Sequence, residues 1–272
     1  MRTRMLAVLG AAATVAAAVA GGGVATAQST GAVYVVHGIP DTPVDVYVDG
    51  ERALDDFEPL SVQGPLDLPA GSHEVAVFPA DAPDNTGEAV IEATADVPAD
   101  GNVSLVAHLD EAGAPTLTPY ANDISAVPAG QARLAVRHDA AAPAVDVRAG
   151  GSPVISGLTN PNEQAVVVPA GTVEADVVLA GTQDVVIGPA SLTLEEGTAT
   201  FVHAVGSADD GTLALVPFTI TGLGGAPEGV PAGSGEPAVS GALWVAGGSV
   251  LTLALAGGVL LLWRRNPAAR GS

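Results

Sequence analysis

The sequence predicts an all-β protein with two tandem immunoglobulin-like antiparallel β-sandwich domains and one C-terminal transmembrane helix. Three observations support this prediction: valine-rich segments alternate apolar and polar residues, a series of motifs recurs about 100 residues later, and both ends are apolar. We therefore divide the 272 residues into 1–27 (signal peptide), 28–126 (repeat 1), 127–222 (repeat 2), 223–240 (stalk), 241–263 (transmembrane helix) and 264–272 (cytoplasmic tail).

The strand pattern is clear where Val44, Val46 and Val48 alternate with polar residues, because a half-buried strand has period two. Asp49 and Gly50 then favour a tight hairpin, since both tolerate positive φ. No segment between residues 28 and 222 has a 3.6-residue period, so no helix is expected there. Seven or eight short strands suit a sandwich. In repeat 1 we expect them at 32–37, 44–48, 51–57, 60–68, 73–78, 88–95, 102–109 and 115–120.

An internal duplication underlies the two domains. The collinear matches are Val36-His37 with Arg137-His138, Val44-Asp45-Val46 with Val145-Asp146-Val147, and Leu68-Pro69-Ala70-Gly71 with Val168-Pro169-Ala170-Gly171. Such a series indicates a repeated unit of about 95 residues. Two copies are too few for a solenoid, so we interpret them as tandem domains.

The N-terminal residues 1–27 have the features of a secretory signal peptide. Two arginines precede the apolar run from Met5 to Ala20, and Ala25-Thr26-Ala27 forms an A-x-A cleavage site. We expect cleavage after Ala27. The alternative, an uncut transmembrane helix, is disfavoured because the run is rich in alanine and short for a span.

A second apolar run extends from Ala242 to Trp263 and carries no charge. At about 1.5 Å per residue it is long enough for a hydrocarbon core of roughly 30 Å. Arg264 and Arg265 follow directly, so the positive-inside rule places the tail in the cytoplasm. We expect a single-pass protein of the cell membrane whose two domains are extracellular, on a flexible stalk rich in Gly, Pro and Ser.

The charge and composition exclude several classes of function. All 30 acidic residues but only four arginines lie within residues 28–240, and the chain has no lysine. A surface this negative repels phosphate, so nucleic acid is excluded as a partner. The absence of cysteine excludes disulfides, thiolate metal sites and thiol nucleophiles.

The histidines offer the nearest approach to catalytic chemistry. His37 and His138 are equivalent in the two repeats, and we expect each to anchor a turn rather than to bind a ligand. His108 and His203 fall one position out of register, which predicts that they face opposite sides of their sheets. The sequence lacks H-E-x-x-H and G-x-S-x-G motifs, so we predict no catalytic residue and no cofactor.

One loop carries oxygen ligands of the kind that Ca²⁺ prefers, namely Asp81, Asp84, Asn85 and Glu88. Their spacing differs from that of an EF-hand, and repeat 2 has only Asp184 nearby. An ordinary polar turn is therefore the preferred interpretation, with these four residues as the calcium candidates.

The segment Val36-His37-Gly38-Ile39-Pro40-Asp41-Thr42-Pro43-Val44-Asp45-Val46-Tyr47 resembles the V-H-x-x-P-D-x-P-x-V-D-V-Y pattern of the bacterial domain of unknown function 4397 (DUF4397). It has one residue fewer around Pro43. The resemblance extends over both repeats, although repeat 2 has Arg137–Pro143 where the family has S-P-D-A-P. It implies an envelope-associated β-sandwich without an established activity.

Together these features predict a non-catalytic, membrane-anchored surface protein, with binding, adhesion or structural duties in the bacterial envelope. Its expected partners are the membrane and an envelope protein or glycan. Two alternatives remain: an envelope enzyme that uses scattered carboxylates with His37 or His138, and the ectodomain of a signalling complex. A tail of nine residues leaves little cytoplasmic machinery for the latter.

Overall fold

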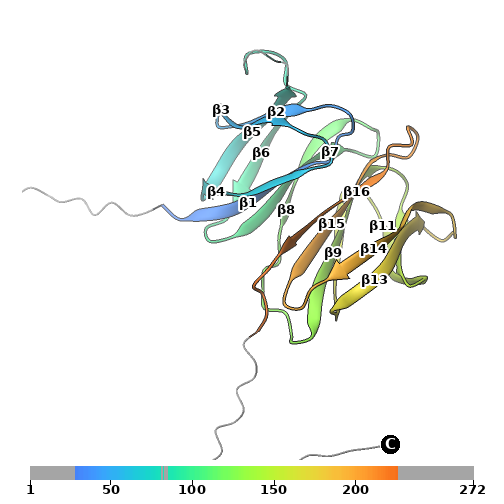
Figure 1. The fold of residues 1–272 in the computed structure, drawn as a ribbon. Helices are drawn as coiled ribbons and strands as arrows, with labels where there is room; N and C mark the ends of the chain where they lie inside the picture. Colours follow the sequence, from blue (N-terminus) through green and yellow to red (C-terminus); the bar gives the residue numbers. More distant parts are fainter. Residues whose placement is uncertain (1–27, 81, 83–84, 226–272) are drawn as a thin grey trace, which may run out of the picture. The chain divides into compact units, whose positions relative to one another are not determined.

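The computed structural model describes residues 28–80, 82 and 85–225, which contain 16 β-strands and no helix (Figure 1). The strands of repeat 1 are β1 (Thr30–His37), β2 (Val44–Val48), β3 (Glu51–Phe57), β4 (Val62–Pro69), β5 (Gly71–Pro79), β6 (Ile91–Val97), β7 (Asn102–Leu109) and β8 (Pro115–Ala121). Those of repeat 2 are β9 (Gln131–Ala141), β10 (Val145–Ala149), β11 (Ser152–Leu158), β12 (Asn162–Pro169), β13 (Gly171–Leu179), β14 (Val185–Leu194), β15 (Ala199–Ser207) and β16 (Ala214–Ile220). All eight strands predicted for repeat 1 are present.

The predicted signal peptide, transmembrane helix and cytoplasmic tail lie outside the described residues. Within the part of the chain that the structure describes, no helix is long and apolar enough to cross a membrane. The described residues of both repeats belong to a single compact unit.

Each repeat contains two four-stranded sheets that form a sandwich-like pair. In repeat 1 the strand orders are β4-β1-β7-β8 and β3-β2-β5-β6, and in repeat 2 they are β12-β9-β15-β16 and β11-β10-β13-β14. Adding eight to each strand number of repeat 1 gives the order in repeat 2. The two repeats therefore share one topology, as expected for an internal duplication. Valine, leucine and isoleucine side chains from both sheets of each pair form its core.

One sheet of each repeat contains a parallel pair, which corrects the expectation of a purely antiparallel sandwich. β1 runs parallel to β7, and β9 runs parallel to β15. Parallel neighbours require a long crossover, and here the chain passes through five other strands between the two. The alternation of apolar and polar residues is the same for either pairing direction, so the sequence pattern could not reveal it.

The predicted hairpin turn is confirmed and recurs in the second copy. Asp49 and Gly50 have φ values of 51° and 81°, and Gly150 and Gly151 have 55° and 79°. Two successive positive φ values are the signature of a type I′ turn, whose twist matches that of the flanking strands. The turn therefore sets the register of β2 with β3 and of β10 with β11.

The segment after β16 packs against the start of repeat 2. The Val127 N–H donates to the Leu223 carbonyl at 2.7 Å, and Leu223 contacts the apolar cluster around Phe201. The first residues of the predicted stalk, 223–225, are thus part of the folded unit.

Candidate functional site

A group of buried polar side chains lies where the two repeats meet, between β7 and β8 of repeat 1 and β9 and β15 of repeat 2. An apolar cluster flanks it, formed by Val36 and Val106 from repeat 1 and Val205 and Val216 from repeat 2. These four valines are at most 2% exposed. The repeats are therefore joined by a true core rather than by the linker alone.

Arg137 is the centre of the polar group and is fully buried. Its Nε donates to the Glu163 carboxylate at 2.7 Å, and its Nη2 donates to the Asn122 Oδ1 at 2.7 Å. The guanidinium carbon lies 4.4 Å from the ring centre of Tyr120 and 4.7 Å from that of Phe201. Burial lowers the pKa of Arg137, but an arginine remains charged at neutral pH.

Asp139 and His203 form a second buried pair beside Arg137. The Nδ1 of His203 lies 2.7 Å from the Asp139 Oδ2, and the Tyr120 hydroxyl donates to the Asp139 Oδ1 at 2.5 Å. On the opposite side of the ring, Nε2 lies 3.5 Å from the Arg137 Nη1. A guanidinium can only donate, so Nε2 must accept and Nδ1 must carry the proton. His203 is therefore neutral in this arrangement.

The shifts in pKa agree with these assignments. Burial lowers the pKa of His203 and outweighs the Asp139 carboxylate, which acts in the opposite direction. Burial alone would raise the pKa of Asp139, but the hydrogen bonds from His203 and Tyr120 bring it below its usual value. Burial also raises the pKa of Tyr120. The group thus holds an ionised Asp139 and Arg137, with neutral His203 and Tyr120.

A histidine oriented by a carboxylate is also the core of a general-base pair. A base must reach a substrate proton, however, and both His203 and Asp139 are fully buried. The ring nitrogen that does not contact Asp139, Nε2, faces Arg137 instead of solvent. This geometry supports a structural connection between the repeats.

Sequence reasoning missed Arg137 and Asp139 as members of this group. One signal was available: Arg137 interrupts the apolar run Leu134-Ala135-Val136, at the position where repeat 1 has Val36. The departure of repeat 2 from the family pattern thus marks the residues that bind the repeats together.

The equivalent histidines anchor turns, as predicted. The Nε2 of His37 donates to the Thr42 carbonyl at 2.8 Å, and that of His138 donates to the Pro143 carbonyl at 3.0 Å. In both rings Nδ1 accepts the backbone N–H two residues further on. This pattern requires a neutral imidazole, and burial lowers the pKa of His37 accordingly.

The prediction that His108 and His203 face opposite sides is wrong. The β1–β7 register pairs Val36 with Val106, whereas the β9–β15 register pairs Arg137 with His203. His203 therefore corresponds to Val106, two positions before His108. Two positions along a strand return a side chain to the same face.

His73 has the opposite protonation preference. Its Nδ1 lies 2.6 Å from the Asp49 carboxylate and its Nε2 lies 2.7 Å from the Pro69 carbonyl oxygen. Both partners only accept, so both nitrogens donate and the ring carries a positive charge. The Pro69 carbonyl and then the Asp49 carboxylate raise the pKa of His73. Val173 occupies the corresponding position in repeat 2.

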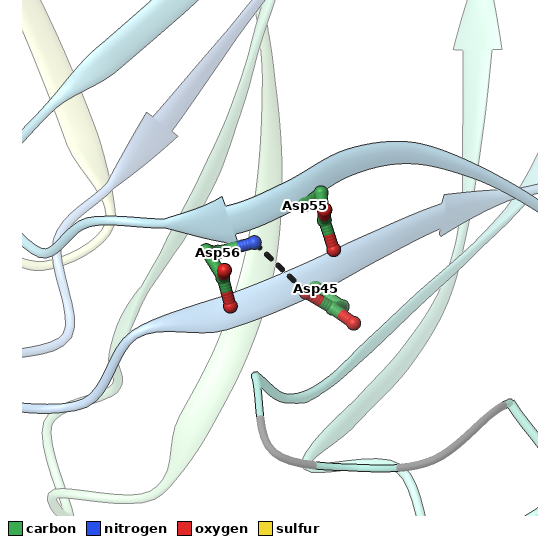
Figure 2. A group of neighbouring side chains, drawn as sticks. All are labelled: Asp45, Asp55 and Asp56. Atoms are coloured by element: carbon green, nitrogen blue, oxygen red, sulfur yellow. Dashed lines mark hydrogen bonds between the residues drawn. The ribbon is translucent and has the colours of Figure 1, made fainter.

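Three carboxylates lie close enough together to share a cation, namely Asp45, Asp55 and Asp56 (Figure 2). Arg52 already supplies a positive charge, with its Nη1 3.2 Å from Asp45 and 2.5 Å from Asp55. The Asp45 Oδ1 also accepts the Asp56 N–H at 2.9 Å. The side chain of Asp45 is thus satisfied by protein groups.

The bond from Asp56 to Asp45 explains the aspartate of the Val-Asp-Val motif. In repeat 2 the Gly157 N–H donates to the Asp146 Oδ1 at 2.8 Å in the same way. Asp56 and Gly157 both have positive φ, and the β2–β3 and β10–β11 ladders shift register beside them. The motif aspartate therefore holds a bulge in the next strand.

The loop with the four calcium candidates is described only in part, because Asp81 and Asp84 lie outside the described residues. The Asn85 Nδ2 donates to the Gly50 carbonyl at 3.0 Å, so its amide supports the hairpin between β2 and β3. Glu88 is exposed. An ordinary polar turn stays the preferred prediction for this loop, and calcium binding stays the alternative.

Comparison with known proteins agrees with the predicted resemblance. The family model described as domain of unknown function (DUF4397) matches residues 31–148. This span covers β1 to β8 and the first two strands of repeat 2. A search of curated proteins finds no match to the chain.

Proposed function

We propose that this chain is a non-catalytic, membrane-anchored protein of the bacterial cell surface. Two immunoglobulin-like domains, residues 28–126 and 127–222, face outward and bind or space components of the envelope. The apolar segment 241–263 crosses the membrane once. An envelope protein or glycan is the partner, and the strong negative charge excludes nucleic acid.

The observation that carries the non-catalytic part of this proposal is the burial of His203 and Asp139. They form a histidine–carboxylate pair of the kind that a general base uses, and neither side chain has exposed surface. Arg137 faces the remaining ring nitrogen. These side chains connect two repeats into one unit, which suits a protein that presents a surface rather than one that turns over a substrate.

The chain has no native cysteine, so single cysteines can report its topology. Ala112→Cys places a thiol in an exposed turn of repeat 1, and Ser272→Cys places one at the C-terminal residue. A membrane-impermeant maleimide should label Ala112→Cys on intact cells and Ser272→Cys only after permeabilisation. Labelling of Ala112→Cys only in permeabilised cells would remove the surface location.

The non-catalytic part has its own test. The purified full-length chain is assayed against ester, peptide and glycoside substrates, together with His37→Gln, His138→Gln and His203→Gln. We expect no turnover by any of the four proteins. A reproducible activity that one of these substitutions abolishes, while circular dichroism shows an intact fold, would establish the enzyme alternative.

A further inference from the structure

The two repeats differ in how completely their sheets close over the core. In repeat 1 the side chains leave a cavity of only about 10 Å³ between the two sheets, and β6 packs along β8 at the side of the sandwich. In repeat 2, a groove of about 190 Å³ lies between the sheets, lined by residues of the corresponding strands β14 and β16. Val136, Val147 and Val177 are among the residues of its floor.

Two substitutions between the copies account for part of this groove. The strand registers align Val75 of repeat 1 with Ala175 and Leu105 with Val202. Both smaller residues line the groove, and their larger counterparts are buried in the core of repeat 1. Removing methyl groups from a packed core leaves a cavity unless the backbone collapses.

The shape of β14 accounts for another part of the groove in repeat 2. β14 has ten residues, against seven in β6, and its ladder with β13 shifts register between Ala175 and Val177. Gly188 and Pro189 occupy this irregular part of the strand. A bulge bends the strand that carries it, and proline has no N–H for the ladder. The irregular part of β14 therefore keeps β14 from packing along β16 in the way that β6 packs along β8 in repeat 1.

The lining is almost entirely apolar. Leu192 and Leu215 are half-buried within it, and the only polar side chains are those of Ser191 and Asp176. Arg148 holds Asp176 through two hydrogen bonds of 2.6 Å and 2.8 Å, so this carboxylate is already neutralised. An apolar groove of this kind gains free energy when it exchanges water for an alkyl chain, at about 25 cal/mol per Å² buried.

Charge selects among alkyl ligands. Repeat 2 carries ten acidic residues against three arginines, and repeat 1 carries 18 against one. This field disfavours a ligand with an anionic headgroup. The place of repeat 2 in the chain indicates that the alkyl ligand comes from the membrane, because only 15 residues separate Gly225 from the apolar segment that begins at residue 241. By random-coil scaling, 15 residues correspond to about 20 Å, so a membrane anchor at 241–263 would place repeat 2 near the bilayer surface.

We propose that the groove between β14 and β16 holds an alkyl chain of an uncharged lipid from the membrane in which the protein is anchored. This inference rests on the proposed membrane anchor and specifies what repeat 2 binds. The lipid chain supplies the core contacts that Val75 and Leu105 supply in repeat 1.

The test uses the full-length chain in phosphatidylcholine nanodiscs that contain a small fraction of a monoacylglycerol with a diazirine at the end of its chain. Irradiation followed by peptide mapping locates the crosslinks. We expect labelled residues in 185–194 and 214–220, in addition to labels in 241–263 from exposure to the bilayer. A matched diazirine fatty acid should label the groove strands less because its carboxylate is charged.

The chain itself supplies the blocking variant. Ala175→Val with Val202→Leu installs the residues of repeat 1 and should reduce groove labelling about tenfold. Labelling of 241–263 should not change, which makes it an internal control. If the double variant fails to fold, Ala190→Leu, at another position in the lining, fills the groove independently.

Equal groove labelling in wild type and in a folded blocking variant would overturn the inference. So would groove labelling by the fatty acid as strong as that by the monoacylglycerol. Labels in 241–263 without labels in the groove would remove the lipid site and leave the anchor intact. Labels in the groove without labels in 241–263 would instead count against the proposed anchor.

Discussion

His203 donates a hydrogen bond of 2.7 Å to Asp139 in a position where neither side chain reaches solvent. Both residues belong to repeat 2, but the Tyr120 hydroxyl of repeat 1 completes the arrangement by donating to the same carboxylate. A charged group is retained in such an environment only when its partners are complete. The buried ions therefore favour one arrangement of the two repeats over others.

Replacement of Arg137 by methionine tests this connection. The substitution keeps an apolar stem but leaves Glu163 without the Arg137 donor and Asn122 Oδ1 with one of its two donors, so the free energy of unfolding should fall by about 3–5 kcal/mol. Urea denaturation of the full-length chain measures this loss. Arg52→Met is the matched control, because the Arg52 side chain is 47% exposed and should contribute far less. Equal losses in the two variants would contradict the role given to Arg137.

Acid should destabilise the fold through His37 and His203. Burial lowers the pKa of both below the unfolded value of about 6.5, so the unfolded chain binds more protons in this range. Their contribution to stability is complete above that pH and is lost as the pH falls through the folded pKa values. NMR titration of the ring protons gives those values directly. Asp139→Asn should lower the pKa of His203 further, because the carboxylate raises it.

The contribution of His73 to stability should depend on pH in the direction opposite to that of His37 and His203. The Pro69 carbonyl and the Asp49 carboxylate raise its pKa, so its contribution is present below about pH 6.5 and is lost as the pH rises through the folded value. His73→Val, the residue of repeat 2, should abolish this component of the pH dependence. Unfolding free energies at two pH values measure it. An unchanged slope in the variant would show that the ring is not positively charged in the fold.

The aspartate of the Val-Asp-Val motif should matter for stability and not for metal binding. Asp45→Ala leaves the Asp56 N–H without its acceptor, and loss of a buried hydrogen bond of this kind costs about 1–3 kcal/mol. Asp55→Ala, in the same cluster but exposed, is the control and should cost little. Thermal melts with and without calcium complete the comparison. A rise in melting temperature that calcium causes in wild type and not in Asp45→Ala would contradict this assignment.

The strands and turns of repeat 1 could be predicted because each rests on local chemistry. Val44, Val46 and Val48 show the period of a strand, and Asp49-Gly50 can adopt the two positive φ values that the hairpin needs. Because the motifs of repeat 1 recur in repeat 2, the same strands and turns could be predicted there. These signals depend on residues that are neighbours in sequence.

The connection between the repeats could not be predicted in the same way. Tyr120 and Asp139 are separated by a linker, and no sequence period reports that they meet. The groove of repeat 2 depends on differences such as Val75 against Ala175, which become visible only when strand registers align the copies. Pairing direction and contacts across an interface are properties of tertiary packing, which composition leaves open.

Hydrogen exchange of the full-length chain tests most directly whether the two repeats form one unit. The slowest amides of β5 and β13 lie in sheets of different repeats, in each case in the sheet that does not carry the Arg137 group. We predict that both exchange with the same free energy in wild type and with different free energies in Arg137→Met. Different free energies already in the wild-type chain would mean that the repeats unfold independently, in contradiction to the connection described above.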